Sequence, residues 1–433
     1  MKNNIQKLNT EPYKGTRDFY PEDMALQRYI FSTMRNVAEK YGYVEYDASI
    51  LEETAIYHAK SGSEIVNEQT YSFTDRGGRD VTIRPEMTPT VARMIARKRQ
   101  ELPLPLRWYS IPNLFRYERP QRGRLREHWQ LNVDLFGIDN IEADAEIITV
   151  AYEVMKAFGA KDENFVIRLN SRKLMNYLVN EYFGLNEDEG YQLSKLIDRK
   201  NKTSEEDFIA QAEELLGTRV KELTDFLACR KLSDITNELS ENEGVKDLEK
   251  LQELLDAKGI KNYIFDPSLM RGFDYYTGMV FEVFDTNPIN SRSLFGGGRY
   301  DDLVGIFGVE KVPGVGFGMG DVTIADYMET YDLLPKYQSP TQLYICCLDE
   351  KASKFADEVA NYLREKDINV AVDYTNRKVG AQIKTAEKQN IPFIICIGDE
   401  ETKTRKFRLK NLEKRKEQVV SWNDLPEKIL KSK

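Results

Sequence analysis

Apolar residues recur at helical spacing in two segments of the first third of the chain. Residues 21–42 carry apolar side chains near every third or fourth position and end at Gly42, which suits the cap of a helix C-terminus. Residues 142–158 repeat this amphipathic pattern. We therefore predict a helix over each segment.

Between these helices the pattern changes to short runs rich in β-branched and aromatic residues, separated by Gly and Pro. The runs are YSFTDRGGRDVTIRP from Tyr71, LRWYSIPNLFRYE from Leu106 and HWQLNVDLFG from His128. DRGGR suits a hairpin turn. The three runs predict an antiparallel sheet.

Residues 171–259 form a polar stretch rich in Leu, Glu, Asp and Lys with little strand signal, which predicts a helical insertion. Runs rich in strand formers and Gly return in residues 260–330. We therefore expect residues 1–170 and 260–330 to build one domain of the α+β class, whose sheet is completed after the insertion.

Pro and polar residues at 331–340 predict a linker. From residue 341 to residue 433 strand and helix patterns alternate, which is typical of βαβ units on a mixed sheet. A separate small α/β domain is expected there.

The composition is that of a globular protein, with 41% hydrophobic and 31% charged residues among 433. No apolar run approaches the roughly 20 residues that cross a bilayer, and the first residues do not resemble a signal peptide. We expect a cytoplasmic protein without a membrane segment. The four cysteines show no CxxC spacing, so neither disulfides nor a protein-held metal are indicated.

A net charge of -9 makes the whole surface a poor non-specific partner for nucleic acid. Basic residues gather in two places, residues 116–126 and residues 402–416. Each is either a local binding patch for a polyanion or an ordinary solvated charged face.

The segment FRYERPQRGRLREHWQ, residues 115–130, holds the densest candidate chemistry. Arg116 and Glu118 alternate as on one face of a strand, and Gly123 lies among arginines that suit a loop. Such an arginine can bind phosphate or carboxylate, and such a glutamate can accept an amino group. A weak cross-strand ion pair is the alternative.

A second candidate is TIRPEMTPTVARM, residues 82–94, where a strand ends at Pro85 and a helix begins. Glu86 and Thr88 then lie at a junction that opens toward a ligand, and the carboxylate could bind an ammonium group. The alternative is an acid that only complements the helix dipole.

The third candidate is RGFDYYTGMVFE, residues 271–282, together with the glycine-rich runs GGGRYDDLVG and GVGFGMG. Glycines allow a backbone to approach a ligand closely, or they kink a buried strand. Neither glycine run has the spacing of a phosphate loop or the context of a dinucleotide site.

GTRDFYPEDM, RPEMTPTVAR, FRYERPQRGR, RGFDYYTGMVFE and GGGRYDDLV resemble, in order, segments of class II aminoacyl-tRNA synthetases and specifically of the histidyl-tRNA synthetase family. The resemblance covers essentially the whole chain. It implies an antiparallel sheet flanked by helices, a helical insertion and a C-terminal α/β anticodon-binding domain. It also implies a homodimer that uses ATP with Mg²⁺, L-histidine and tRNA-His.

For ATP, the resemblance implies that Arg116 grips the α-phosphate, that Glu118 accepts the adenine amino group and that Arg126 reaches the terminal phosphates. Arg271 would neutralise charge as the histidine carboxylate attacks phosphorus. Arg116 and Arg271 would thus be the catalytic residues. No protein-held metal is implied, because Mg²⁺ would be bound largely by the phosphates.

For histidine, the resemblance implies a site in which carboxyl, hydroxyl and amide groups hold the amino end and a donor and an acceptor read the two ring nitrogens. The amino end would be bound by Glu86, Thr88 and Gln130, and the imidazole by Asp134, Tyr276 and Tyr300, with Tyr275 and Arg271 completing the site. The basic loop Arg122 to Arg126 would enter the acceptor end of the tRNA.

The chain departs from the family pattern in two places. The third motif normally carries a Glu-Arg pair after GFGMG, and its arginine packs on adenine, whereas this chain has Val322 and Thr323. Where the first motif usually has a proline at the dimer interface, this chain has Ser49.

The missing arginine raises alternatives. One is a catalytically silent paralogue, either the histidine-sensing regulatory subunit of ATP phosphoribosyltransferase or the synthetase-like part of a translation-control kinase. The other is an RNA-binding module without catalysis. The terminal α/β domain and the four retained side chains of Arg116, Glu118, Arg126 and Arg271 favour an active synthetase.

Overall fold

The long apolar strands on either side of the insertion pair with each other in one sheet. The computed structural model describes residues 8–58, 69–200, 203–270 and 275–431. The chain divides into two compact units, Met1–Leu334 and Pro335–Lys433, and this division lies inside the stretch predicted as a linker.

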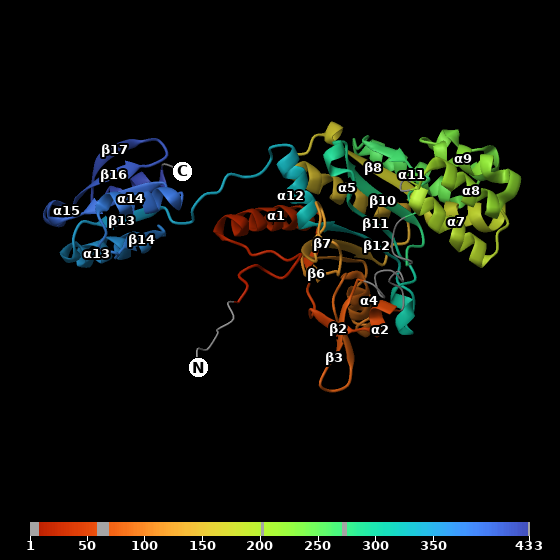
Figure 1. Cartoon of the computed structure of the whole chain (residues 1–433), viewed down its shortest axis with the longest axis horizontal. Coiled ribbons are helices and arrows are strands. Elements are labelled where there is room, and N and C mark those ends of the chain that lie inside the picture. Colours follow the sequence, from red (N-terminus) through yellow and green to blue (C-terminus); the bar gives the residue numbers. More distant parts are fainter. Residues whose placement is uncertain (1–7, 59–68, 201–202, 271–274, 432–433) are drawn as a thin grey trace, which may run out of the picture. The chain divides into compact units, whose positions relative to one another are not determined.

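Within the described residues of the first unit the main sheet has nine strands, in the order β1-β5-β7-β12-β11-β10-β8-β9, with β6 paired to β7 (Figure 1). Neighbours are antiparallel except for the outermost pairs, β1 with β5 and β8 with β9. The strands are β1 (Val44–Glu45), β5 (Leu106–Ser110), β6 (Asn113–Phe115), β7 (Glu127–Phe136), β8 (Phe165–Ser171), β9 (Tyr263–Phe265), β10 (Met279–Asp285), β11 (Ser293–Arg299) and β12 (Gly314–Gly320).

Three helices, α1 (Pro21–Lys40), α5 (Ile141–Ala157) and α12 (Asp321–Thr330), pack on one face of this sheet, and α1 contacts both of the others (Figure 1). α1 begins with Pro21, and its first turn is capped because the Tyr20 amide donates to the Asp23 carboxylate at 3.0 Å. The predicted helix over residues 21–42 is therefore confirmed, and Gly42 follows its end with a left-handed φ of 80°.

The opposite face carries α4 (Thr88–Arg97), α2 (Ala55–His58) and a small sheet of β2 (Leu51–Glu53), β3 (Tyr71–Thr74) and β4 (Asp80–Ile83), in the order β2-β4-β3. β3 and β4 form the predicted hairpin through DRGGR. This hairpin builds its own sheet and does not join β5 and β7. The second predicted run is also interrupted, since Pro112 separates β5 from β6 and the strand ends before Arg116.

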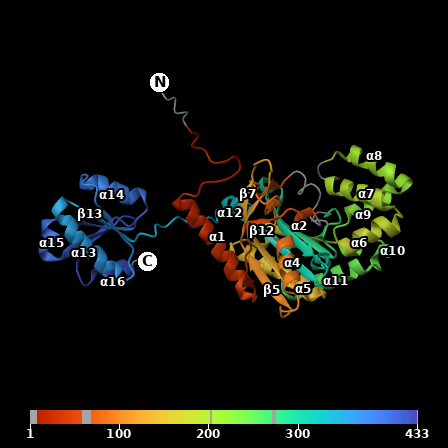
Figure 2. The same cartoon turned by 90° about the horizontal axis from the view of Figure 1, so that it is seen from below.

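The polar stretch between β8 and β9 is helical, and Figure 2 shows α7, α8 and α9 gathered at the end of the first unit opposite α1. The domain boundaries predicted at residues 171 and 259 stay a prediction. The helices are α6 (Arg172–Tyr177), α7 (Glu187–Arg199), α8 (Glu205–Leu216), α9 (Val220–Ala228), α10 (Asn237–Ser240) and α11 (Glu243–Ala257).

The second unit has a mixed sheet in the order β14-β13-β15-β16-β17 with helices that bury its apolar faces. Its strands are β13 (Leu343–Cys347), β14 (Val370–Asp373), β15 (Phe393–Ile397), β16 (Lys406–Asn411) and β17 (Lys416–Ser421). Its helices are α13 (Ser353–Arg364), α14 (Val379–Lys388), α15 (Asp399–Thr404) and α16 (Leu425–Leu430). No helix among the described residues of either unit is long and apolar enough to span a bilayer.

A buried ion pair fastens the end of β11 to the first turn of α5. Arg299 is 6% exposed and Asp144 is 1% exposed, and the guanidinium Nε donates to both carboxylate oxygens at 3.0 and 3.1 Å. Further donors of Arg299 reach the carbonyls of Ile138 and Asn140 and the carboxylate of Asp301. All three guanidinium nitrogens of Arg299 therefore have partners within the protein.

We expect Asp144→Ala to lower the free energy of unfolding of the first unit by about 3–5 kcal/mol, because the substitution removes the buried one of the two carboxylates that pair with the buried guanidinium. Asp162→Ala is the matched control, because Asp162 pairs with Lys156 but its side chain is 56% exposed. The control should lose no more than about 1 kcal/mol. Differential scanning calorimetry measures both, and equal losses would contradict the structural role of Asp144.

Candidate active site

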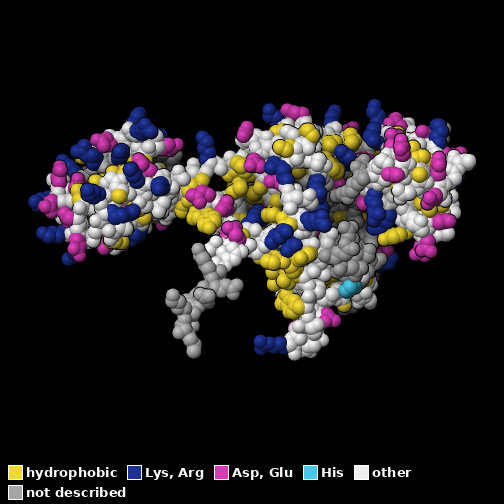
Figure 3. Space-filling model, viewed as in Figure 1, with side chains coloured by type: hydrophobic (Ala, Val, Ile, Leu, Met, Phe, Trp, Pro, Cys, Tyr) yellow, Lys and Arg dark blue, Asp and Glu magenta, His cyan; other side chains and the backbone are white. Residues whose placement is uncertain are grey.

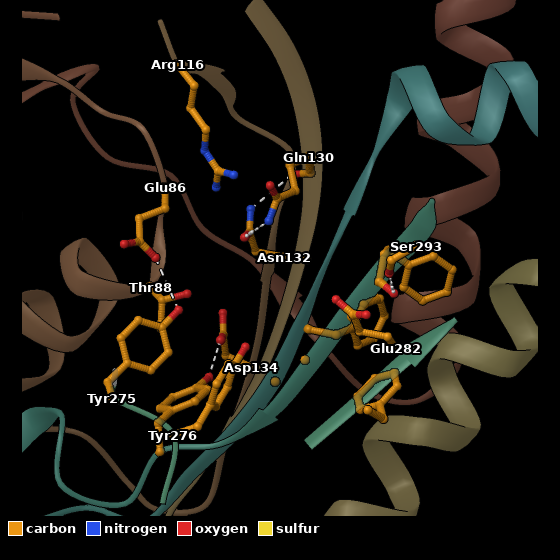
Figure 4. Close-up of a pocket in the computed structure, with 18 residues that line it drawn as sticks. Glu86, Thr88, Arg116, Gln130, Asn132, Asp134, Tyr275, Tyr276, Glu282 and Ser293 are labelled. Atoms are coloured by element: carbon orange, nitrogen blue, oxygen red, sulfur yellow. Dashed lines mark hydrogen bonds between the residues drawn. The ribbon is translucent and has the colours of Figure 1, made fainter. Parts of the chain in front are cut away.

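A cavity of about 240 Å³ lies on the face of the main sheet opposite α5, and Figure 4 shows the side chains that line it. Its floor is formed by β7, β10, β11 and β12, and its walls by the start of α4 and by the residues before β10. The side chains that give it chemical character are Glu86, Thr88, Arg116, Gln130, Asn132, Asp134, Tyr275, Tyr276, Glu282, Ser293 and Tyr300.

One end of the cavity is an aromatic box around a carboxylate. The ring of Tyr275 lies 5.0 Å from that of Tyr276 and 5.7 Å from that of Tyr300. The Tyr300 hydroxyl donates to Oδ1 of Asp134, whose side chain is 2% exposed. Oδ2 of Asp134 is buried and has no hydrogen-bond partner in the described structure. The box therefore offers flat walls and an acceptor for one N–H or O–H group.

Burial raises the pKa of Asp134 to about 7, although the hydrogen bond from Tyr300 and the nearby hydroxyl of Tyr46 oppose the rise. Burial also raises the pKa values of Tyr275, Tyr276 and Tyr300, so these phenols stay protonated at neutral pH. The box thus contains several hydroxyl donors and one carboxylate that is close to its midpoint at neutral pH.

Glycine is required in β12 because the side chains of β7 lie across it. Gly316 pairs with Asp134, and a Cβ there would lie 2.6 Å from both Asp134 Oδ1 and the Tyr300 hydroxyl. At Gly318 a Cβ would lie 1.7 Å from Nε2 of Gln130. The run GVGFGMG therefore makes room for polar side chains of the site.

The other end of the cavity carries opposite charges. Glu86 is 2% exposed and accepts a hydrogen bond from the Tyr275 hydroxyl at 3.1 Å. Arg116 points into the same space (Figure 4), and its Nε donates to the Pro85 carbonyl at 2.9 Å. Thr88 is the first residue of α4, and Gln130 projects from β7. The ammonium and carboxylate groups of a zwitterionic ligand could therefore bind here to a carboxylate and a guanidinium at the same time.

Glu118 and Arg126, two of the residues predicted to bind ATP, do not line this cavity. The Glu118 carboxylate pairs with Arg124 at 2.5 Å. Arg126 is 9% exposed, stacks on Tyr117 at 3.9 Å and donates to the Tyr13 hydroxyl at 2.9 Å. Arg271 lies outside the described residues.

The basic loop after Glu118 is fastened to α12. Arg122 donates to the Asp326 carbonyl and pairs with Glu329, and the Gly123 amide donates to the Asp326 carboxylate at 2.7 Å. Thr323, at the place of the expected third-motif arginine, donates to the Leu294 carbonyl at 2.7 Å. A Cβ on Gly123 would lie 3.5 Å from the Thr323 methyl group, so the loop lies directly against this position.

Three polar residues of the cavity were missed from the sequence. Asn132 lies between Gln130 and Asp134 on β7 and donates to the Gln130 carbonyl. Because every second residue of a strand points to the same face, the predicted residues Gln130 and Asp134 could have indicated Asn132 as well. Glu282 ends the predicted RGFDYYTGMVFE segment, whereas Ser293 had no signal. Among the described residues no cluster of three or more His, Cys, Asp or Glu side chains could hold a metal by itself.

Two family models match the chain. The model described as histidyl-tRNA synthetase matches residues 15–322, and the model described as anticodon binding domain matches residues 342–432. A histidine–tRNA ligase of Leptospira biflexa is 43% identical, with 98% of each chain covered.

Solved structures give the same result for the fold. A histidyl-tRNA synthetase from Nostoc sp. PCC 7120 superposes with a TM-score of 0.83 at 25% identity, covering 99% of this chain and 100% of that one. A Bacillus halodurans protein described as an ATP phosphoribosyltransferase regulatory subunit/histidyl-tRNA synthetase gives a TM-score of 0.74 at 24% identity, covering 90% and 99%. The predicted α+β fold with a class II sheet and a C-terminal α/β domain is confirmed.

The pKa of Asp134 generates a stability prediction. In the unfolded chain an aspartate titrates near 3.9, whereas in the folded protein the pKa of Asp134 is about 7. Between about pH 4 and pH 7 the unfolded chain has lost a proton that the folded protein keeps, so this group lowers stability as pH rises through that window.

Asparagine cannot ionise. The unfolding free energy of Asp134→Asn relative to the wild type should therefore increase by about 2–4 kcal/mol from pH 4 to pH 7 and stay level above pH 7. Urea denaturation at a series of pH values measures this difference, and a difference that is constant with pH would refute the buried, proton-binding state of Asp134.

Proposed function

The chain belongs to the histidyl-tRNA synthetase family of class II aminoacyl-tRNA synthetases, and on that basis we propose that it activates L-histidine with ATP and transfers it to tRNA-His. The observation that carries this proposal is the aromatic box with the unsatisfied oxygen of Asp134. The family name gives the class of reaction, and the box supports histidine as the amino acid.

An imidazole fits the box because it is flat and has one N–H group and one ring nitrogen that accepts. The N–H would donate to Asp134 Oδ2, and a tyrosine hydroxyl, from Tyr276 or Tyr300, would donate to the other nitrogen. Leucine or phenylalanine would leave the carboxylate unpaired in a buried place, which is how a polar site rejects apolar competitors. Tyr275 walls the box and holds Glu86 in place.

At the polar end, the ammonium group of histidine would bind Glu86, with Thr88 and Gln130 as further partners. Its carboxylate would then lie near Arg116, which would also bind the α-phosphate of ATP. Arg271 would bind the reacting phosphate as well. Two arginines at this point reduce the repulsion between two anions, so the reaction needs positioning and charge stabilisation more than a base.

In the first step a carboxylate oxygen of histidine attacks the α-phosphorus, and the bond to the β-phosphate breaks, releasing diphosphate. In the second step a ribose hydroxyl at the 3′ end of the tRNA attacks the carbonyl carbon of the adenylate and AMP leaves. No Ser, Cys or His nucleophile is involved. His128 stays neutral, since enclosure of its ring and the charge of Arg116 lower its pKa to about 3.

ATP would enter with Mg²⁺ bound to its phosphates. The donor set suits this ion, because Mg²⁺ commonly takes one or two protein carboxylates and completes its shell with phosphate and water. Glu282 supplies a carboxylate on the cavity wall near Ser293 (Figure 4). When bound, the ion would neutralise phosphate charge.

The adenine and the terminal phosphates would lie beyond the cavity, toward Glu118 and Arg126. In the present structure Glu118 is paired with Arg124. Binding of adenine to Glu118 would therefore require Arg124 to turn away, and its guanidinium would become available to phosphate. The basic loop would receive the acceptor end of the tRNA, and the second unit would bind the anticodon.

The proposed protein partner is a second copy of the chain. The proposed location is the cytoplasm. β1 is an edge strand, and Val44 on it is 64% exposed, while Ile50 and Leu51 are 38% and 42% exposed. Hydrophobic side chains also gather between α1 and β3 in Figure 3. An apolar edge of this kind is stabilised by pairing with a second molecule.

The competing function, a histidine-sensing regulatory subunit without catalysis, has one structural neighbour in its favour. That neighbour is less than 25% identical and shows only the shared fold. The match of the second unit to the anticodon-binding model favours the synthetase.

ATP–diphosphate exchange with each of the twenty amino acids tests the proposed function. We expect exchange with histidine alone, and we expect Arg116→Ala and Arg271→Ala each to reduce it by at least about 100-fold, because each removes transition-state charge stabilisation. Histidine binding by calorimetry should remain measurable for Arg271→Ala. Arg76→Ala, an exposed hairpin arginine outside the cavity, is the control. No exchange with histidine would refute the enzyme and support the regulatory alternative.

The dimer is tested separately. Val44→Glu places a charge on the proposed interface, so light scattering after gel filtration should show the mass of one chain where the wild type shows two. Val419→Glu is the matched control, because Val419 is equally exposed at 65% but lies in the second unit. A wild-type monomer, or a variant that remains dimeric, would count against this interface.

A further inference from the structure

Behind the aromatic box lie three buried oxygen atoms that have no hydrogen-bond partner among the described residues: the Tyr46 hydroxyl, the Ser110 hydroxyl and Asp134 Oδ2. Such groups are rare in folded proteins, and each normally has a structural or functional explanation. No motif marked Tyr46 or Ser110 in the sequence, and neither residue lines the cavity.

Strand pairing brings the three residues together. Tyr46 directly follows the edge strand β1, and its amide donates to the Tyr109 carbonyl of β5 at 2.8 Å. Its ring lies 5.5 Å from that of Trp108, which is the register partner of Asp134 on β7. Ser110 is fully buried two residues along β5. The tyrosine ring is thus wedged at the sheet edge with its hydroxyl directed inward.

The three groups act on one another. Burial dominates the raised pKa of Asp134, and hydroxyl donors from Tyr300 and Tyr46 oppose it. Burial and the Asp134 charge keep the pKa of Tyr46 well above its ordinary value, so its phenol remains a donor, and Ser110 interacts with that phenol in turn. A small hydroxyl rotation, or one bridging water, would complete the hydrogen bonds.

Other charged groups act on the surrounding tyrosines and not on this carboxylate. Glu86 influences Tyr276, and Arg84 influences Tyr46. Around Asp134 itself, within the part of the chain that the structure describes, the groups that act on its protonation are the hydroxyls of Tyr300 and Tyr46. The balance between its neutral and anionic forms therefore depends on those two donors.

We propose that Tyr46, assisted by Ser110, is a positioning residue for the amino-acid substrate: from behind the box it holds the Asp134 carboxylate as an anion, oriented to accept the imidazole N–H. This inference rests on the proposed function, because it assumes that Asp134 binds the ring. Tyr46 itself does not touch the substrate.

The test is the pH profile of kcat/KM for histidine in ATP–diphosphate exchange from pH 6 to pH 9, which reports groups of the free enzyme. In Tyr46→Phe the ring and its packing on Trp108 remain, but the donor is lost. The acid limb should move up by roughly one pH unit, so kcat/KM falls about fivefold at pH 7 and recovers toward the wild-type value at pH 9. The KM for ATP should not change.

Tyr109→Phe is the matched control. It removes a hydroxyl from a neighbouring buried tyrosine that donates to Glu39 at 2.8 Å and not to Asp134. Its acid limb should coincide with that of the wild type. Ser110→Ala should move the acid limb in the same direction as Tyr46→Phe but less far. If Tyr46→Phe does not fold, the inference is judged on whether the limb moves in Ser110→Ala.

An unmoved limb in Tyr46→Phe, or a loss of equal size at every pH, overturns the inference and leaves the proposed function standing. A wild type without histidine-dependent exchange overturns both. A limb that moves in Tyr46→Phe and not in Tyr109→Phe supports it, because a merely structural effect would not depend on pH.

Discussion

A carboxylate buried in the middle of the main sheet is the constraint on which the rest of the site depends. Asp134 is flanked on β7 by the neighbouring strands β5 and β12 and is only 2% exposed. A buried acid is tolerated only with donors around it. The hydroxyl of Tyr300 donates to the carboxylate, and the hydroxyl of Tyr46 lies close to it. Gly316 has no side chain and so leaves room for the carboxylate. Together these features define the box.

Rigidity of this arrangement comes from the sheet and from the ion pair between Arg299 and Asp144. Tyr300 directly follows Arg299, and the Tyr300 amide donates to the Gly314 carbonyl. The Thr277 amide donates to the Arg299 carbonyl, so the segment carrying Tyr275 and Tyr276 is fixed to the same strand end. One buried guanidinium thus supports both the floor and one wall of the cavity, which is what a selective polar site requires.

Much of the fold was predictable because its signals are local. The helix of α1, the hairpin of β3 and β4 and the long strand β7 follow from periodicity and turn residues, and the order of motifs identified the class II sheet. Most residues proposed for histidine do share one cavity, although their roles stay a prediction. Two features that depend on distant packing were not visible: the stacking of Arg126 on Tyr117, and the place of Tyr46 behind Asp134. No sequence pattern near either residue reports which strand will lie beside it.

The pairing of β7 with β12 also sets an order for biosynthesis. Asp134 meets Gly316 only after the helical insertion and the strands from β9 to β12 have left the ribosome, so the cavity floor closes late, through contacts of long sequence separation. The insertion helices, whose contacts are mostly local, can form earlier. Until β12 arrives, β7 presents an unpaired edge, and the nascent chain is most exposed to wrong strand pairing during that interval.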